Sequence, residues 1–345
     1  MKRIALLSVV ALSLIGLATT NFASKANSAI SKAEDDFQLV KVADGIYAAI
    51  AKPGGLASGN AGFIVGDGGV LIVDTFFTPT AVEELISEIA TQTKQPIKYA
   101  VNTHYHLDHT GGNQVLAARG VPIIAHENVM AWQLTKNTRF LPAPADLQKR
   151  RADTAKQLSE TPADQKDKRT QLEKQLRRLD AIAQIKLTQP SVTFGVGELS
   201  VYLGTREVKL FTLPGHTGGD VLVYVPDANV IFTGDMGWSK TLPNLVDATV
   251  TDWIKSLDLL LQRHAGAKFI PGHGEVATAA EMREFRDYLD GLLSTVRRAI
   301  DEGLTLEQAK DQFKLPDQYK SFAFQNFAQP NIEDMYKELT GTKNK

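Results

Sequence analysis

The sequence has no cysteine, almost no net charge and, beyond its N-terminal segment, no long hydrophobic run. Without cysteine the protein forms no disulfide, offers no thiolate to a metal and has no cysteine nucleophile. Its 38 basic and 39 acidic residues leave a formal net charge of -1, which gives no basic footprint for a nucleic acid. We therefore expect no nucleic-acid partner, and any bound metal must be held by His, Asp or Glu.

The N-terminus has the layout of an export signal. Lys2 and Arg3 precede an apolar run at 4–17, and small and polar residues follow as far as Ala29. Because the run is short for a membrane span, we interpret residues 1–29 as a signal peptide cleaved after Ala26 or Ala29, with an uncleaved anchor as the alternative. This predicts an exported protein, periplasmic or secreted, with no stable membrane insertion after cleavage.

The remaining 30–345 have the apolar content to bury a sizeable core. Two stretches, about 37–135 and 190–275, share an order of strand hairpins followed by helix and strand. This order predicts an α/β fold of two sheets packed face to face with helices outside. Expected strands include 37–42, 46–50, 61–65, 70–73, 97–101, 121–125, 192–194, 199–203, 208–213, 221–225, 230–232 and 268–270.

Two regions lie outside this repeated pattern. Interleaved charges and a leucine stripe at about 141–186, broken at Thr161-Pro162, predict an inserted helical hairpin. It is either a solvated insertion packed along that stripe or a lid or dimer contact. The C-terminal stretch at about 301–345 is expected to be a helical extension.

Possible metal ligands gather where predicted strands end. Four of them directly follow the apolar run at 97–101, and three more stand in later strand-end loops: His104, His106, Asp108, His109, His216, Asp235 and His273. Open α/β sheets place their sites beyond the carboxyl ends of strands. Imidazole and carboxylate groups suit a borderline cation such as Zn²⁺.

In their order and context these residues resemble the motifs of the metallo-β-lactamase-fold hydrolases, over about 37–300. The motifs are the run from His104 to His109, Gly-His-Thr at His216, Thr-Gly-Asp at Asp235 and Pro-Gly-His-Gly at His273. The resemblance implies an αββα sandwich with a helical insertion and a metal-dependent hydrolase domain over 30–345.

The resemblance also implies a first zinc on His104, His106 and His216, a second on Asp108, His109 and His273, and Asp235 as the bridge. We thus expect two zinc ions per chain, although iron and manganese also suit these ligands. Two cations about 3.5 to 4 Å apart need bridging anions, and a carboxylate plus a hydroxide supply them. The expected reaction is attack of that hydroxide on a carbonyl, with Asp108 as the catalytic residue that orients it.

Four further residues are candidates for supporting roles. Asp74 and Asp220 are expected to orient ligand loops through hydrogen bonds. Tyr105 is expected to pack at the site or to help stabilise an oxyanion, and Asn244 to contact substrate.

The absence of cysteine narrows the subclass, since the best-known β-lactamases of this fold carry cysteine on the second zinc. The first hypothesis is a hydrolase of a small-molecule ester, thioester or lactone. The alternatives are a metallo-β-lactamase, a mononuclear iron sulfur dioxygenase on the same fold, and a metal-binding protein without catalysis. The pattern leaves the substrate and the oligomeric state open.

Overall fold

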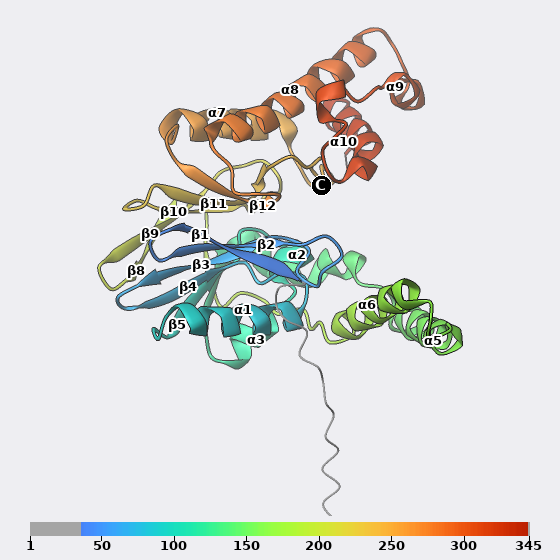
Figure 1. Cartoon of the computed structure of the whole chain (residues 1–345). Coiled ribbons are helices and arrows are strands. Elements are labelled where there is room, and N and C mark those ends of the chain that lie inside the picture. Colours follow the sequence, from blue (N-terminus) through green and yellow to red (C-terminus); the bar gives the residue numbers. More distant parts are fainter. Residues whose placement is uncertain (1–35, 344–345) are drawn as a thin grey trace, which may run out of the picture. The chain divides into compact units, whose positions relative to one another are not determined.

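The computed structural model of the protein describes residues 36–343. The predicted signal peptide at 1–29 lies outside the described residues. Within the described range the chain builds two mixed β-sheets with helices on their outer faces (Figure 1). This arrangement agrees with the α/β sandwich that the strand and helix patterns predict.

The first sheet contains seven strands that lie side by side in chain order. Its first four strands are antiparallel, and the last four run parallel from β4 onward. Parallel neighbours bring the carboxyl ends of β4, β5 and β6 to one edge, where the histidine-rich segment follows β5. The strands are β1 (Phe37–Ala43), β2 (Ile46–Ala51), β3 (Ala61–Gly66), β4 (Gly69–Val73), β5 (Ile97–Val101), β6 (Ile123–His126) and β7 (Val192–Phe194).

The second sheet has five strands in the order β12-β11-β10-β9-β8. Only the pair β11 and β12 is parallel. The strands are β8 (Glu198–Leu203), β9 (Arg206–Thr212), β10 (Val221–Val225), β11 (Val230–Trp238) and β12 (Lys268–His273).

A core of β-branched and aromatic side chains joins the inner faces of the two sheets. Ile64 and Leu71 of the first sheet lie in one buried cluster with Val208, Val223 and Phe232 of the second. This packing constrains the strand register, because a shift of one residue would move the side chains of the inner face to the opposite face of the sheet.

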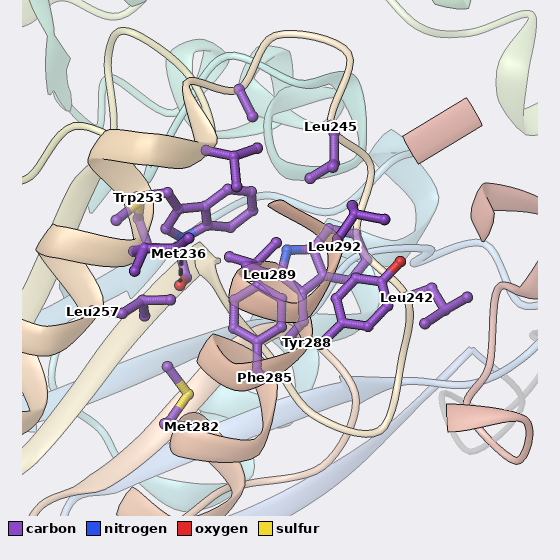
Figure 2. Packing of buried hydrophobic residues seen from close by; sticks show 14 of the residues in the cluster. Met236, Leu242, Leu245, Trp253, Leu257, Met282, Phe285, Tyr288, Leu289 and Leu292 are labelled. Atoms are coloured by element: carbon purple, nitrogen blue, oxygen red, sulfur yellow. Dashed lines mark hydrogen bonds between the residues drawn. The ribbon is translucent and has the colours of Figure 1, made fainter. Parts of the chain in front are cut away.

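Helices cover the outer face of each sheet. On the first sheet, α1 (Pro79–Gln92) begins with the Thr78 cap and Pro79, and packs beside α3 (Asn113–Ala118). On the second, α7 (Val250–Arg263), α8 (Ala279–Asp301) and α10 (Ala328–Leu339) share one apolar cluster. Figure 2 shows its centre, where Trp253 and Met236 face Phe285 and Leu289.

The two outlying regions are helical. The stretch at 141–186 holds α5 (Pro144–Glu160) and α6 (Lys166–Ile182), separated at the predicted break, Thr161-Pro162. After α8 come α9 (Leu306–Gln312), the 3₁₀ turns η3 (Asp317–Tyr319) and η4 (Gln325–Phe327), and α10. Between 36 and 343, no helix is both long enough and apolar enough to span a bilayer.

Several boundaries differ from those predicted. The strand expected at 230–232 continues to Trp238, and the strand expected at 268–270 continues to His273. Asp235 and His273 thus lie within strands and not in loops after them, because β11 and β12 stay paired through a register shift beside Gly234, whose φ is +50°. Three short elements were not predicted: α2 (Leu107–Thr110), α4 (Glu127–Thr135) and η2 (Asn137–Phe140).

Candidate metal centre

Four buried side chains from both sheets form a first group of possible metal ligands: His104, His106, His216 and Asp235. The two histidines that follow β5 meet His216, which stands in the loop between β9 and β10. His106 Nδ1 lies 3.0 Å from His216 Nε2, and His216 Nε2 lies 3.3 Å from Asp235 Oδ2. One donor atom from each residue, all within 4.8 Å of one another, can surround a cation.

A second group beside the first consists of Asp108, His109 and His273. Asp108 and His109 belong to the short helix α2, and His273 ends β12. His273 Nε2 lies 3.3 Å from Asp108 Oδ2, and His109 Nε2 lies 3.8 Å from the same oxygen. The Asp108 side chain is 27% exposed, whereas both histidines are buried, so this group has one side open to solvent.

Asp235 lies between the two groups and presents one carboxylate oxygen to each. Its Oδ2 faces His104 and His216 of the first group at 3.8 and 3.3 Å. Its Oδ1 faces His109 and His273 of the second group at 3.1 and 3.6 Å. This is the arrangement of a carboxylate that bridges two cations.

Several donor atoms fit a metal because they lack hydrogen-bond partners. Within the described residues, His104 Nε2 of the first group is buried without a hydrogen bond, as are His109 Nε2 and Asp235 Oδ1 at the second group. Buried polar atoms left unpaired are costly, so unpaired donors at both groups indicate a cation at each. Gly272 leaves room for this set, since a Cβ at that position would meet Asp235 Oδ1 at 1.9 Å.

Burial and charge set the protonation of these histidines. Burial lowers the pKa of His216 to about 3 and holds the pKa of His104 well below its usual range, so both are neutral at pH 7. At His109 burial acts in the same direction, but the carboxylates of Asp235, Asp108 and Asp74 outweigh it and raise the pKa well above its usual value. A cation bound in the second group would take the place of that proton.

Asp74 holds the histidine-rich segment, as the sequence suggests. This residue follows β4 with a φ of +60° and is buried. Its carboxylate accepts hydrogen bonds from the Thr103 N–H at 2.7 Å and the Thr103 Oγ1 at 2.8 Å, and lies 2.9 Å from His109 Nδ1. With Nδ1 engaged in this way, His109 keeps Nε2 for a metal.

Asp220 fixes the loop that carries His216. Its carboxylate accepts hydrogen bonds from the Thr217 N–H at 2.7 Å and from Thr217 Oγ1 at 2.6 Å. Burial raises the pKa of Asp220 to about 8. In neither group does Asp220 supply a donor atom.

Asp247 is a residue that the sequence analysis did not identify. Its Oδ2 lies 2.9 Å from His106 Nε2 and accepts hydrogen bonds from the Tyr105 hydroxyl at 2.5 Å and from Arg139. When His106 Nε2 donates to this carboxylate, Nδ1 keeps its lone pair for the first ligand group. No sequence signal marks the contact, because 141 residues separate Asp247 from His106.

Tyr105 and Asn244 occupy different surroundings. Tyr105 is fully buried, with its hydroxyl committed to Asp247, so it is placed to support the cluster and not to reach a substrate. Asn244 lines a cavity over the cluster. Its side-chain oxygen accepts a hydrogen bond from the Val246 N–H, which leaves the NH₂ group to donate.

Asn60 ties the loop after β2 to the strand end that carries His273. Its amide donates to the carbonyls of Pro271 and Gly274 at 2.9 and 2.8 Å, and its backbone N–H donates to Gly272 O at 2.7 Å. These bonds cross from the first sheet to the second and hold the second ligand group in place.

Comparisons with known proteins agree with this geometry. The sequence profile described as the Metallo-beta-lactamase superfamily matches residues 54–273. A protein from Bacillus cereus named metallo-beta-lactamase type 2 is 24% identical over 213 residues, which are 60% of this chain and 64% of the relative. A linear primary-alkylsulfatase from Pseudomonas sp. is 24% identical over 265 residues, 72% of this chain and 48% of the relative.

The chain therefore spans less than two thirds of the length of each of these two relatives. Among solved structures, a metallo-beta-lactamase from Pontibacter korlensis aligns with a TM-score of 0.55 at 20% identity, covering 74% of this chain and 99% of that one. At this identity the likeness concerns the fold. The matched profile contains every residue of both ligand groups, and the chain belongs to the metallo-beta-lactamase superfamily of metal-dependent hydrolases.

Proposed function

We propose that the protein is a dinuclear metallo-hydrolase that cleaves an ester, thioester or lactone. The observation that carries the proposal is Asp235, whose two oxygens face two separate groups of ligands. A mononuclear enzyme, including an iron sulfur dioxygenase, would need only one of these groups. Zinc is the first choice of metal because all the donors are imidazole or carboxylate.

When bound, two zinc ions would supply a hydroxide at neutral pH and polarise the carbonyl oxygen of the substrate. The chain's own residues would orient the nucleophile and hold the substrate. Asp108, the only partly exposed carboxylate of the two groups, can accept a hydrogen bond from the nucleophile and carry its proton. Asn244 offers an NH₂ donor from the rim of the same cavity.

The test combines metal analysis with a substrate panel. We expect about two metal ions per chain, activity on at least one ester, thioester or lactone, and loss of that activity on chelation and its return with Zn²⁺. Asp108→Asn should lower kcat by about a hundredfold or more. Asp258→Asn, at an exposed position on α7, is the matched control and should leave kcat unchanged. Full activity after complete removal of metal would contradict the proposal.

A second candidate is β-lactam hydrolysis, which relatives named metallo-beta-lactamase type 2 favour. The panel therefore includes nitrocefin, together with a phosphodiester and, because of the alkylsulfatase relative, an alkyl sulfate. If kcat/KM for nitrocefin exceeds that for every ester, thioester and lactone, β-lactam hydrolysis would become the preferred function. One iron per chain would favour the dioxygenase.

We also propose that the protein is exported, from the layout of residues 1–29. N-terminal sequencing of the protein recovered from the cell envelope or medium should begin after Ala26 or Ala29. Recovery only from the cytoplasm with Met1 retained would contradict export.

A further inference from the structure

A cavity of about 500 Å³ lies against the metal cluster, where a substrate must enter. Its floor includes His106, Asp108, Asp235 and His273, so it touches both ligand groups. The ligand groups themselves do not distinguish among acyl groups. The other residues that line the cavity therefore decide which substrates fit.

The walls of the cavity are aromatic. Five rings from four parts of the chain line it: Phe77, Phe140, Trp238, Phe324 and Phe327. Trp238 stacks on His273 with ring centroids 4.3 Å apart, and Phe140 stands edge-on to His106 at 5.5 Å. Apolar rings in direct contact with the metal ligands favour an apolar group next to the reacting carbonyl.

Phe324 belongs to the C-terminal helical region, beyond the residues that the family profile matches. It stands edge-on to Trp238 at 6.3 Å and to His273 at 5.5 Å. Although it packs against these rings, 40% of it is exposed. An apolar substrate chain lying along Phe324 would bury that surface.

The backbone holds Phe324 in this place. Ala323 donates its N–H to Lys240 O at 2.9 Å and accepts one from Leu242 at 3.0 Å, forming a bridge to the segment after β11. Phe324 itself has a φ of +59°, a conformation that L-residues other than Asn and Asp rarely adopt. A bulky residue kept in that conformation beside the two ligand groups is a candidate for a functional role.

The polar part of the cavity is uncharged apart from the ligands. Ser58, Asn244 and Asn326 supply it, and among the described residues of the lining none is Lys or Arg. Arg139 and Lys136, the cations near His106, both face the Asp247 carboxylate, and Lys136 lies 3.9 Å from it. Arg139 and Arg178 stack on the lining rings Phe140 and Phe77, but their guanidinium groups bond to Asp247 and to Gly55 O. A carboxylate or sulfate on the substrate tail would thus meet no Lys or Arg among the lining residues.

We propose that the substrates of this hydrolase are uncharged esters, thioesters or lactones with an apolar chain of several carbons, and that Phe324 is a specificity-determining residue that packs on that chain. This inference rests on the proposed hydrolase function and narrows its substrate class.

The test uses the metal-loaded, full-length protein and a series of p-nitrophenyl esters from acetate to octanoate. We expect kcat/KM to rise roughly threefold for each methylene buried, hence about tenfold between acetate and hexanoate if two of the four added methylenes are buried and more if all four are. The adipate monoester, which matches the hexanoate in chain length but ends in a carboxylate, should be hydrolysed about tenfold more slowly.

Variants assign the effect to Phe324. Phe324→Ala should lower kcat/KM for hexanoate about fivefold, mainly through KM, and leave acetate nearly unchanged. Phe324→Leu should have a kcat/KM for hexanoate between those of the parent and Phe324→Ala. This second variant is a control for a folding defect in Phe324→Ala. Tyr202→Ala, at an exposed aromatic residue on β8, is the matched control and should behave like the parent. Calorimetry with 2-octanone, which cannot be hydrolysed, should show weaker binding to the Phe324 variants.

The outcomes separate the two proposals. Failure to hydrolyse any ester, thioester or lactone would overturn the proposed function itself. Hydrolysis with equal kcat/KM for acetate and hexanoate, or for hexanoate and the adipate monoester, would leave the hydrolase standing and overturn the substrate class. An unchanged chain-length dependence in both Phe324 variants would overturn the role of Phe324.

Discussion

At the scale of single residues, the ligands depend on carboxylates that do not touch the metal. Asp74 engages His109 Nδ1, and Asp247 engages His106 Nε2. Each contact fixes which ring nitrogen remains free for a cation. Both acids are held in place by other donors, Asp74 by Thr103 and Asp247 by Tyr105 and Arg139, so each presents a fixed acceptor to its imidazole.

We predict that Asp247→Asn weakens metal binding in the first ligand group. The amide keeps the size of the side chain but removes the charge that supports the His106 imidazole and pairs with Arg139. Affinity for the metal of the first ligand group should fall about tenfold to a hundredfold, a typical cost for losing such a partner. Competition with a chromophoric chelator measures it, with Asp258→Asn as the control. Affinities equal to those of the parent for both metals would disprove this role.

The sequence predicted the metal ligands but not Asp247, and the difference has a physical reason. The ligands stand in short motifs at the ends of apolar strands, and strand ends that meet at one edge bring their side chains together. Asp247 stands in an irregular loop, far along the chain from His106, and the apolar residues around it carry no period. Only the folded loop shows that its carboxylate turns toward the histidine.

At the scale of elements, the inner strands were predicted closely and the ends of the last two were not. Val230 to Phe232 and Lys268 to Ile270 have the apolar runs of buried strands, but Thr-Gly-Asp and Pro-Gly-His look like turns. Pairing between β11 and β12 overrides that local preference and carries Asp235 and His273 within the sheet. Tertiary pairing of this kind has no local signal in the sequence.

The helical hairpin of α5 and α6 is anchored to the rest of the molecule through two arginines. Arg177 bonds to Asp36 and, at 2.9 Å, to Glu84 of α1, and Arg178 donates to Gly55 O at 2.8 Å. The Arg178 guanidinium also lies 5.4 Å from the ring of Phe77, which lines the substrate cavity. The hairpin therefore braces one side of the cavity, a contact that its charge pattern did not reveal.

The Arg177 anchor predicts a pH dependence of stability. Burial and the adjacent Asp36 carboxylate raise the pKa of Glu84 from 4.5 to about 8. Between those two values the folded protein keeps a proton that the unfolded chain releases, so the free energy of unfolding falls as the pH rises across this window. The pKa of Asp36 is lowered from 3.8, so Asp36 does not titrate within the window.

Urea unfolding at about pH 5.5 and pH 8.5 measures this effect. Between the two pH values, the urea concentration at the unfolding midpoint should fall further for the parent than for Glu84→Gln, because the glutamine side chain does not titrate. Glu83→Gln changes the neighbouring, half-exposed residue of the same helix and should retain the pH dependence of the parent. Identical midpoint changes in the parent and Glu84→Gln would contradict the assignment.

At the scale of the whole molecule, the candidate metal centre joins the two sheets. His104, His106 and His109 follow a strand of the first sheet, whereas Asp235 and His273 belong to strands of the second. Beside them, Asn60 makes the bonds that tie the loop after β2 to the end of β12, at the carbonyls of Pro271 and Gly274. Bound metal would thus add links between halves of the molecule that are otherwise held by their common apolar core.

We predict that removing the metal lowers the thermal stability of the protein as well as its activity. A ligand that binds only the folded state stabilises it by about 4 kcal/mol at a thousand times its Kd, and in a protein of this size each kcal/mol shifts Tm by about 1.5 °C. Calorimetry with and without chelator should therefore show Tm falling by about 6 °C, and added Zn²⁺ should restore it. Asp235→Ala removes the residue shared by both ligand groups, so its Tm should respond little to chelator or zinc. A parent Tm unaffected by chelation, with metal loss verified by analysis, would show that the core and Asn60 hold the sheets without the metal.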